Sequence, residues 1–241
     1  MRDSLHGQRQ SILDRFSDKV QLLIAIRMDD IGRVKALLNH NPMLVNMKME
    51  LEEKRAQPYG WIGSGIHPLY EAAKNGNKTM VQLLLEYGAV MHTKRYDALS
   101  GAVQFNHKEV VKLLLDHKAN VGNRPTQIGS EKTGVFVGVT PLRLSAMKGH
   151  TDIVKLLLEN GANVDSRGQT GRTALHWAAL KGHRDTVKLL LDYGAAICIQ
   201  DELGRTPLDW ALIRNHLEIA NLLQERTGSG QKQVKTRSKR L

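Results

Sequence analysis

Histidine and cysteine are the residues of this chain whose chemistry first suggests a metal site or a nucleophile. The chain holds ten histidines and a single cysteine, Cys198. His150, His183 and His216 recur every 33 residues, and His107 occupies the equivalent position of an earlier copy. A repeated structural element explains such a period better than a metal centre, whose ligands must converge on one point. Cys198 has no sequence neighbour that identifies an activating base, so we expect an inert free thiol, and a lone cysteine forms no internal disulfide.

The common catalytic motifs are absent from the sequence. It contains no HExxH, GxSxG, CxxC or GxxxxGK[ST] pattern, so the usual metal, nucleophile and phosphate-binding arrangements lack their parts. GWIGSG at residues 60–65 is rich in glycine, but it has no GK[ST] ending and predicts a flexible loop. We therefore predict no catalytic residue, no cofactor and no metal.

Length and composition are those of a folded protein. Of its 241 residues, 41% are hydrophobic and 24% charged, which argues against wholesale disorder. Apolar runs such as Leu22 to Ile26 are far shorter than the roughly 18 residues that span a bilayer. The first residues, MRDSLHGQRQ, have no apolar stretch of signal-peptide length. We expect an intracellular protein, cytoplasmic or nuclear, without a transmembrane segment.

The elements that position these residues are internal repeats. Thr140, Thr173 and Thr206 anchor three similar segments 33 residues apart, and earlier copies have their anchors at Val20, His67 and Asp97. Leucine lies two residues past every anchor, at Leu22, Leu69, Leu99, Leu142, Leu175 and Leu208. It also lies seventeen past, at Leu37, Leu84, Leu114, Leu157, Leu190 and Leu223. Six copies of one unit are therefore predicted.

The blocks TPLRLSAMKGH, TALHWAALKGH and TPLDWALIRNH, each followed by an apolar run such as VKLLL, resemble the ankyrin repeat. The resemblance implies an all-α solenoid of about six helix-turn-helix repeats joined by finger loops, which are β-turns or hairpins. The repeats are expected at residues 18–46, 66–94, 95–123, 139–170, 171–203 and 204–228, together forming a domain over 18–228. Thr140, Thr173 and Thr206, with His176, look like the family's hydrogen-bonding residues within the repeat.

Residue types predict where the helices pack and end. The position five past the anchor is small in every copy, which lets inner helices approach closely. Nine past, residues that tolerate a left-handed backbone end the first helix: Asp29, Gly76, Asn106, Gly149, Gly182 and Asn215. The second helix should end similarly at Asn41, Gly88, Gly161 and Gly194, whereas Lys118 and Thr227 are poorer terminators. Lys118 predicts a weak joint in the third repeat, because a non-glycine left-handed residue costs about 1 kcal/mol.

Three segments fall outside the regular repeat. Residues 1–17 contain Ile12, Leu13 and Phe16 at helical spacing and predict a capping helix. Insertions at 47–65 and 122–138 fall at the finger edge, which is often the binding face of a repeat protein. Residues 229–241 have no acid and no apolar period and predict a disordered basic tail.

The resemblance implies a protein partner that binds the fingers and the concave inner-helix surface. Tyr59 and Trp61 in the first insertion offer large contact area. The variable inner-helix positions that carry over here include Glu71, Lys74, Gln104, Phe105, Met147, Lys148, Trp177, Leu180, Lys181, Trp210, Ile213 and Arg214. For the tryptophans, packing on the next repeat is the alternative role.

A formal net charge of +11 raises nucleic acid or an acidic membrane as a rival partner. The tail carries +5 of it, and KTRSKR within the tail resembles a nuclear-import signal. On the outer helices Lys112, Lys155 and Lys188 each precede an acid by four residues, so that stripe is mixed in charge. We therefore predict a non-catalytic interaction module, monomeric outside complexes. The alternatives are a recruiting or regulatory subunit of an enzyme complex and a polyanion binder acting through the tail.

Overall fold

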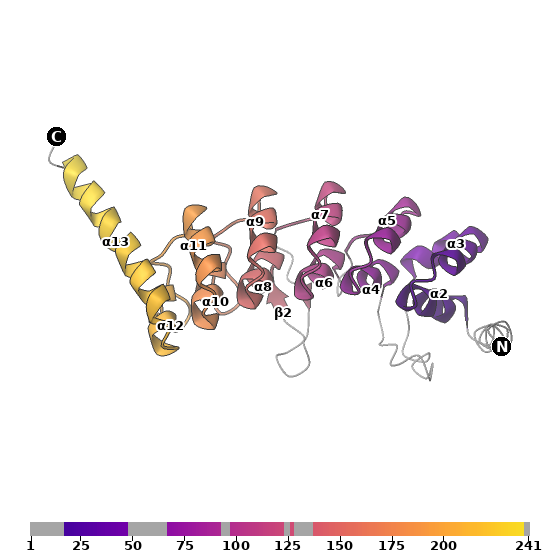
Figure 1. The fold of residues 1–241 in the computed structure, drawn as a ribbon, viewed down its shortest axis with the longest axis horizontal. Helices are drawn as coiled ribbons and strands as arrows, with labels where there is room; N and C mark the ends of the chain where they lie inside the picture. Colours follow the sequence, from indigo (N-terminus) through magenta and orange to yellow (C-terminus); the bar gives the residue numbers. More distant parts are fainter. Residues whose placement is uncertain (1–16, 48–66, 93–96, 123–125, 128–136, 239–241) are drawn as a thin grey trace. The chain divides into compact units, whose positions relative to one another are not determined.

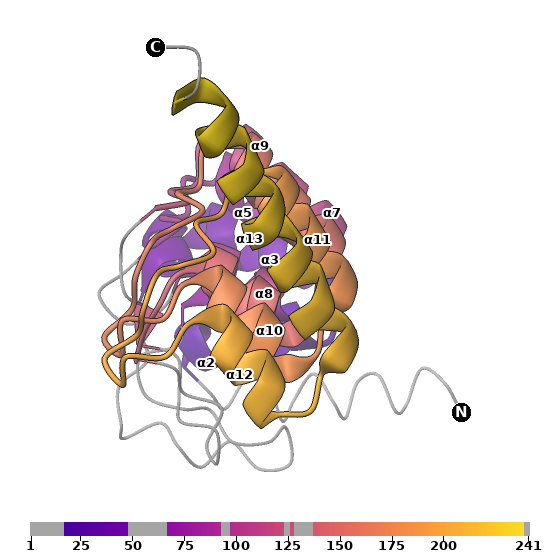
Figure 2. The ribbon, with the colours of Figure 1, turned by 90° about the vertical axis from the view of Figure 1, so that its left-hand side faces the viewer.

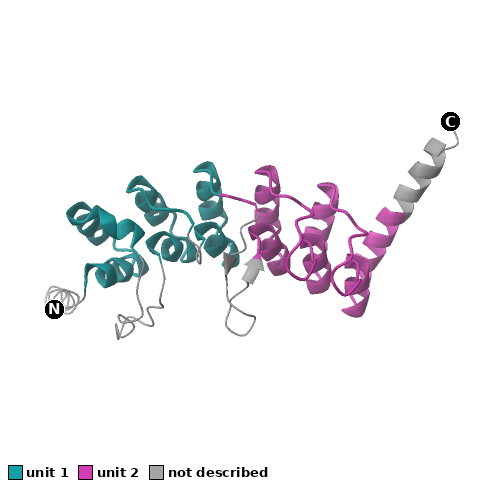
Figure 3. Ribbon diagram, turned by 180° about the vertical axis from the view of Figure 1, so that it is seen from behind, with its two compact units in different colours: residues 1–119 teal, residues 120–241 magenta. Residues whose placement is uncertain are grey.

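The structure, a computed structural model, describes residues 17–47, 67–92, 97–122, 126–127 and 137–238. Within these ranges the chain forms six pairs of α-helices, one pair beginning in each predicted repeat (Figure 1). It divides into two compact units, residues 1–119 and 120–241 (Figure 3). The regular elements of the described ranges are helices apart from one short pair of strands and an isolated bridge between His92 and Asp97, as the all-α prediction requires.

Unit 1 holds three of the helix pairs. The inner helices α2, α4 and α6 pack side by side, and the outer helix α5 packs against α7. A short 3₁₀ helix, η1, follows the first pair and contacts α2, α3 and α4. The elements are α2 (Asp18–Arg27), α3 (Ile31–His40), η1 (Pro42–Asn46), α4 (Pro68–Lys74), α5 (Lys78–Glu86), α6 (Ala98–Gln104) and α7 (Lys108–Asp116).

Unit 2 repeats this two-layer arrangement. The inner helices α8, α10 and α12 form one layer, and the outer helices α9, α11 and α13 form the other (Figure 2). Strands β1 and β2 pair antiparallel ahead of α8. The elements are β1 (Thr126–Gln127), β2 (Val137–Val139), α8 (Pro141–Lys148), α9 (Thr151–Glu159), α10 (Ala174–Lys181), α11 (Arg184–Asp192), α12 (Pro207–Ile213) and α13 (Leu217–Ser238).

The two layers differ in how their helices are buried. Each outer helix buries one apolar stripe, as in α9, where Ile153, Val154 and Leu157 are fully buried and Lys155 is exposed. An inner helix in the middle of a unit, such as α10, is buried nearly all round, because α8 and α12 cover two of its sides and α11 covers a third. Small residues five past the anchor, such as Ala178 and Ala211, are 0% exposed and leave room for this close packing.

The left-handed turns predicted at the end of the first helix are confirmed in all six repeats. The φ angles lie between 58° and 81° at Asp29, Gly76, Asn106, Gly149, Gly182 and Asn215. At the end of the second helix, Gly88, Gly161, Gly194 and Lys118 also adopt positive φ. The prediction is wrong for Asn41, whose φ is −143°, because Pro42 starts η1 and the Asn41 side chain accepts from the Met43 N–H.

The predictions for the segments outside the regular repeat compare differently with the structure. Residues 1–16, which carry the predicted capping helix, and most of the 47–65 insertion lie outside the described residues. In the 122–138 insertion, β1 and β2 form the base of a hairpin. The chain after Gly228 differs from the prediction of a disordered tail, since α13 continues to Ser238. That stretch lacks proline and is rich in Gln, Lys and Arg, which favour a helix that has already started.

Lys118 provides a test of the strained joint. Its φ of 65° is the conformation that glycine adopts at the three equivalent positions. We expect Lys118→Gly to raise the free energy of unfolding by about 0.5–1 kcal/mol, since relief of strain exceeds the extra entropy of glycine. Urea denaturation followed by circular dichroism measures the change.

Gly161→Ala is the matched control for this prediction. A Cβ at Gly161 has no neighbour within 4 Å and its φ is 85°, so the substitution adds backbone strain without a side-chain clash. It should lower stability by about 1 kcal/mol. Destabilisation by Lys118→Gly would show that the joint is not strained.

Candidate functional site

The inner helices of unit 2 end in three exposed cations. Lys148 and Lys181 are the last residues of α8 and α10, and Arg214 follows the last residue of α12. They lie eight residues past successive anchors, 33 residues apart. Trp177 lies one turn before Lys181 on α10 and is partly exposed. We call the exposed residues of α8, α10 and α12, together with the turns that precede these helices, the inner surface of unit 2.

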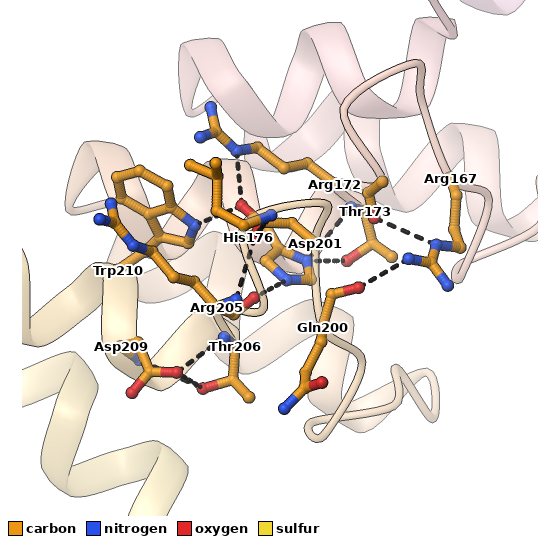
Figure 4. Close-up of polar contacts among 12 residues, drawn as sticks. Arg167, Arg172, Thr173, His176, Gln200, Asp201, Arg205, Thr206, Asp209 and Trp210 are labelled. Atoms are coloured by element: carbon orange, nitrogen blue, oxygen red, sulfur yellow. Dashed lines mark hydrogen bonds and ion pairs between the residues drawn. The ribbon is translucent and has the colours of Figure 1, made fainter.

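A buried carboxylate organises the turn that leads into α12 (Figure 4). Asp201 is 5% exposed. Its Oδ1 accepts the backbone N–H groups of Leu203 at 2.9 Å and Arg205 at 3.0 Å. Its Oδ2 accepts the Trp210 indole N–H at 2.9 Å and the Arg172 Nε–H at 3.0 Å. One side chain therefore joins its own turn to α12 and to the turn before α10.

Asp201 stays ionised over a wide pH range. Burial disfavours the carboxylate, but the hydrogen bonds from Arg205, Trp210, Arg172 and Leu203 outweigh burial and lower its pKa to about 2. An ionised acceptor strengthens each of these hydrogen bonds. The network is therefore intact at neutral pH.

Arginine side chains stack on the two tryptophans of this region. The Arg172 guanidinium carbon lies 4.2 Å from the Trp210 ring centroid and 5.2 Å from that of Trp177. Arg205 lies 4.8 Å from the Trp210 ring. Because Arg172 is also held by Asp201, its cation–π contact favours one position of the Trp177 ring. Trp177 is thus a preorganised aromatic at the inner surface of unit 2.

The Thr-x-x-His hydrogen bonding expected from the resemblance is present in α10. The Thr173 N–H donates to Nδ1 of His176 at 3.2 Å, and Nε2 lies 3.1 Å from the Arg205 carbonyl oxygen. Nδ1 therefore accepts and Nε2–H donates, which assigns a neutral imidazole. Burial lowers the pKa of His176, and its hydrogen bond to the Arg205 carbonyl only partly opposes this shift. His176 holds the α12 turn and has a structural role.

The periodic histidines link successive repeats. His183 Nε2 lies 3.1 Å from the Met147 carbonyl oxygen at the end of α8. A Cβ added at Gly149 would lie 2.6 Å from the His183 ring, so glycine is required there. In unit 1, His107 makes the same contact with the Lys74 carbonyl oxygen at 2.9 Å. These histidines therefore satisfy carbonyl groups at helix ends.

Three of the predicted partner-binding residues in unit 2 are buried, and the structure corrects their assignment. Trp210 is 8%, Leu180 6% and Met147 5% exposed, because each packs between neighbouring helices. Trp210 in addition gives its only hydrogen-bond donor to Asp201. The remaining predicted residues do reach the inner surface: Lys148, Trp177, Lys181, Ile213 and Arg214.

The predicted residues of unit 1 divide in the same way. Phe105 is 47% exposed and Gln104 is partly exposed. Glu71 and Lys74 line a pocket of about 590 Å³ with Ile26, Arg27, Asp29, Asn75 and Asn77. Glu71 is only 2% exposed and pairs with Arg27 Nε at 2.7 Å, so its first role is to neutralise that cation. Tyr59 and Trp61 lie outside the described residues.

Sequence reasoning missed Arg172, Asp201 and Arg205, which hold the inner surface of unit 2 in place. The sequence feature that could have drawn attention to this region is the pair of Gly-Arg-Thr triplets at 171–173 and 204–206, each immediately before an inner helix. Within the described ranges, no three His, Cys, Asp or Glu side chains lie close enough to hold a metal ion. None of the described helices is long and apolar enough to cross a membrane.

Comparison with known proteins identifies the repeats. A family model described as ankyrin repeats in three copies matches residues 22–125, 126–201 and 142–235. The matches cover the helix pairs of both units. They agree with the repeat period of the sequence and with the paired helices of the structure.

Several curated proteins are similar to part of the chain. The probable E3 ubiquitin-protein ligase XBOS32 of Oryza sativa subsp. japonica is 35% identical over 104 residues, 42% of this chain and 18% of that protein. The E3 ubiquitin-protein ligase XBAT33 of Arabidopsis thaliana is 31% identical over 132 residues, 54% of this chain and 22% of that protein. The NAD-capped RNA hydrolase NUDT12 of Homo sapiens is 36% identical over 105 residues, 42% of this chain and 20% of that protein. The matched segments therefore span about a fifth of each relative.

Replacement of Asp201 tests the network around the α12 turn. Its pKa of about 2 lies below the ordinary value of about 3.9, so the ionised form contributes about 2–3 kcal/mol to stability. This contribution is complete above about pH 4 and is lost as the pH falls toward 2, because the folded state then takes up the proton. We expect Asp201→Asn to lower the free energy of unfolding by about 2 kcal/mol at pH 7, with a smaller difference at pH 3.

Urea denaturation of both proteins across this pH range measures the difference. Asp185→Asn is the control, because its side chain is 83% exposed and should change stability by less than about 0.5 kcal/mol. A difference in the free energy of unfolding between wild type and Asp201→Asn that stays constant down to pH 2 would contradict the assigned ionisation.

Proposed function

The chain belongs to the ankyrin repeat family, and from this premise we propose that it is a protein-interaction module whose partner docks on the fingers and inner helices. The inner surface of unit 2 supports the proposal best. It combines a partly exposed tryptophan, an isoleucine that is 53% exposed and three exposed cations on a turn-and-helix frame. Aromatic and arginine side chains of this kind dominate the binding energy of protein interfaces.

Trp177 carries this proposal. Its ring contacts Arg172, which is itself fixed by the buried Asp201 carboxylate. An aromatic that is already held in one place loses little conformational entropy when a partner covers it. The geometry therefore favours Trp177 as an anchor for the partner, with Ile213 and the neighbouring cations around it.

The interaction requires no chemistry from the chain itself. Ankyrin repeat regions are typically non-catalytic, and we assign no catalytic residue. Two of the histidines that first suggested a metal site, His107 and His183, bond to backbone carbonyl groups at helix ends. The proposed role is therefore recognition, with affinity set by the surface of the inner helices.

A recruiting region for an enzyme is the second candidate function. Two of the similar proteins are named E3 ubiquitin-protein ligases and one is named an NAD-capped RNA hydrolase. The segment they share with this chain makes up about a fifth of each. In such an arrangement the repeats would select the partner on which another part of the complex acts.

Substitution of Trp177 tests the interaction directly. We expect Trp177→Ala in the full chain to reduce capture of specific binding proteins from a cell extract by about tenfold, equivalent to 1.4 kcal/mol. The melting temperature should fall only slightly, because the ring is partly exposed and its indole N–H forms no hydrogen bond with the described residues. Quantitative mass spectrometry of the captured proteins measures the first effect and calorimetry the second.

Tyr193→Ala is the matched control, since Tyr193 is a 39% exposed aromatic beyond the end of the outer helix α11. It should leave capture unchanged. Equal loss of captured proteins in both variants, or loss in Trp177→Ala that merely follows unfolding, would overturn the proposed surface.

A further inference from the structure

Charge is segregated between the two faces of unit 2. Between residues 137 and 227, the outer helices carry four cations and six acids. The inner helices and turns carry seven cations and four acids. The inner cations are Arg143, Lys148, Arg167, Arg172, Lys181, Arg205 and Arg214, and the inner acids are Asp165, Asp201, Glu202 and Asp209. The inner side is therefore net positive and the outer side net negative.

Three of the four inner acids are already used inside the unit. Asp201 accepts four hydrogen bonds. Asp209 accepts the Thr206 N–H at 2.8 Å and the Thr206 hydroxyl at 2.7 Å, which caps α12. Asp165 accepts the Ala196 N–H at 2.9 Å. These three carboxylates thus accept hydrogen bonds from donors inside the unit.

The cations at the ends of the inner helices face solvent. Lys148, Lys181 and Arg214 are all exposed, and neither Lys148 nor Arg214 forms an ion pair with any residue of the described ranges. Adjacent inner helices contact one another, and packed helix axes lie about 8–10 Å apart. The three cations therefore form a row across α8, α10 and α12, with Trp177 and Ile213 beside it.

These cations also stabilise the helices on which they lie. A cation in the last turn of a helix interacts favourably with the helix dipole, an effect of about 0.3–1 kcal/mol. In unit 1, Arg27 and Lys74 lie in the last turns of the inner helices α2 and α4. Both pair with Glu71, at 2.7 and 3.9 Å. Unit 1 thus supplies an acid for its cations, and unit 2 does not do so for Lys148 and Arg214.

We propose that the inner surface of unit 2 binds an acidic segment of the partner protein, whose carboxylates pair with the row formed by Lys148, Lys181 and Arg214. This inference rests on the proposed function and specifies the chemistry of the partner. The apolar side chains beside the row favour a peptide over a nucleic acid, because Trp177 already stacks on Arg172 and the row offers no series of free rings for bases.

The experiment uses the full chain and two charge-reversal variants with the same net charge. Lys148→Glu with Arg214→Glu alters the row. Lys155→Glu with Lys188→Glu alters exposed lysines of the outer helices α9 and α11 and leaves the row intact. The probe is a short fluorescein-labelled peptide in which glutamate alternates with leucine, and fluorescence anisotropy reports its dissociation constant at physiological salt. A peptide with glutamine in place of glutamate and a single-stranded DNA oligonucleotide complete the set.

We expect the row variant to bind the glutamate peptide at least about tenfold more weakly than wild type, and the outer-helix variant within about twofold. The glutamine peptide should bind wild type more weakly than the glutamate peptide. Circular dichroism should show both variants folded. If the row variant is not folded, Lys148→Gln with Arg214→Gln replaces it and Lys155→Gln with Lys188→Gln replaces the outer-helix variant, so that the net charges still match.

Equal weakening by the two variants would overturn the inference, because attraction would then follow net charge alone. The inference would also be overturned if wild type did not bind the glutamate peptide. It would be overturned too if wild type bound the oligonucleotide more tightly than the glutamate peptide and this binding depended on Lys148 and Arg214. If these results occurred while Trp177→Ala still reduced capture of a partner, they would contradict the acidic partner but not the proposed function.

Discussion

The structure depends on one constraint, which is that no helix pair in the chain can bury its apolar faces alone. Leu99, Leu175 and Val187 are 0% exposed only because the neighbouring pairs cover them. Stability in such a protein is the sum of the stability of each repeat and of the interfaces between repeats. The small residues of the inner helices and the Gly–His contacts keep neighbouring pairs close enough for those interfaces to form.

Within unit 2, the packing of neighbouring helix pairs also depends on the turns before the inner helices. A stacked pair of helices still needs its connecting turn held in one conformation, and Asp201 does this with four hydrogen bonds. The carboxylate holds Arg172, Arg172 contacts the Trp177 ring, and the three cations lie at equivalent ends of α8, α10 and α12. A polar network built for stability thus also preorganises the surface that we propose for partner binding.

The repeat period made most of the fold predictable from the sequence. Leucines and small residues at fixed offsets defined the packing, and the left-handed turns followed from Gly, Asn and Asp at the ends of the first helices. The candidate surface was predictable only in part. Trp210 was expected at the binding face, but its indole N–H finds Asp201 nine residues earlier, a pairing that depends on the shape of the turn. The repeated Gly-Arg-Thr triplets marked the position of Arg172 but not its contact with Asp201, which joins two successive repeats.

Hydrogen exchange of the full chain with and without its captured partner tests the central claim most directly, because it locates the covered surface without any substitution. Mass spectrometry of the peptides would report protection for each helix and turn. We expect the partner to slow exchange in the turns at 166–173 and 199–206 and at the ends of α10 and α12, with α9 and α11 unchanged. Protection confined to the outer helices, or to the segment after Gly228, would contradict recognition through the inner surface of unit 2.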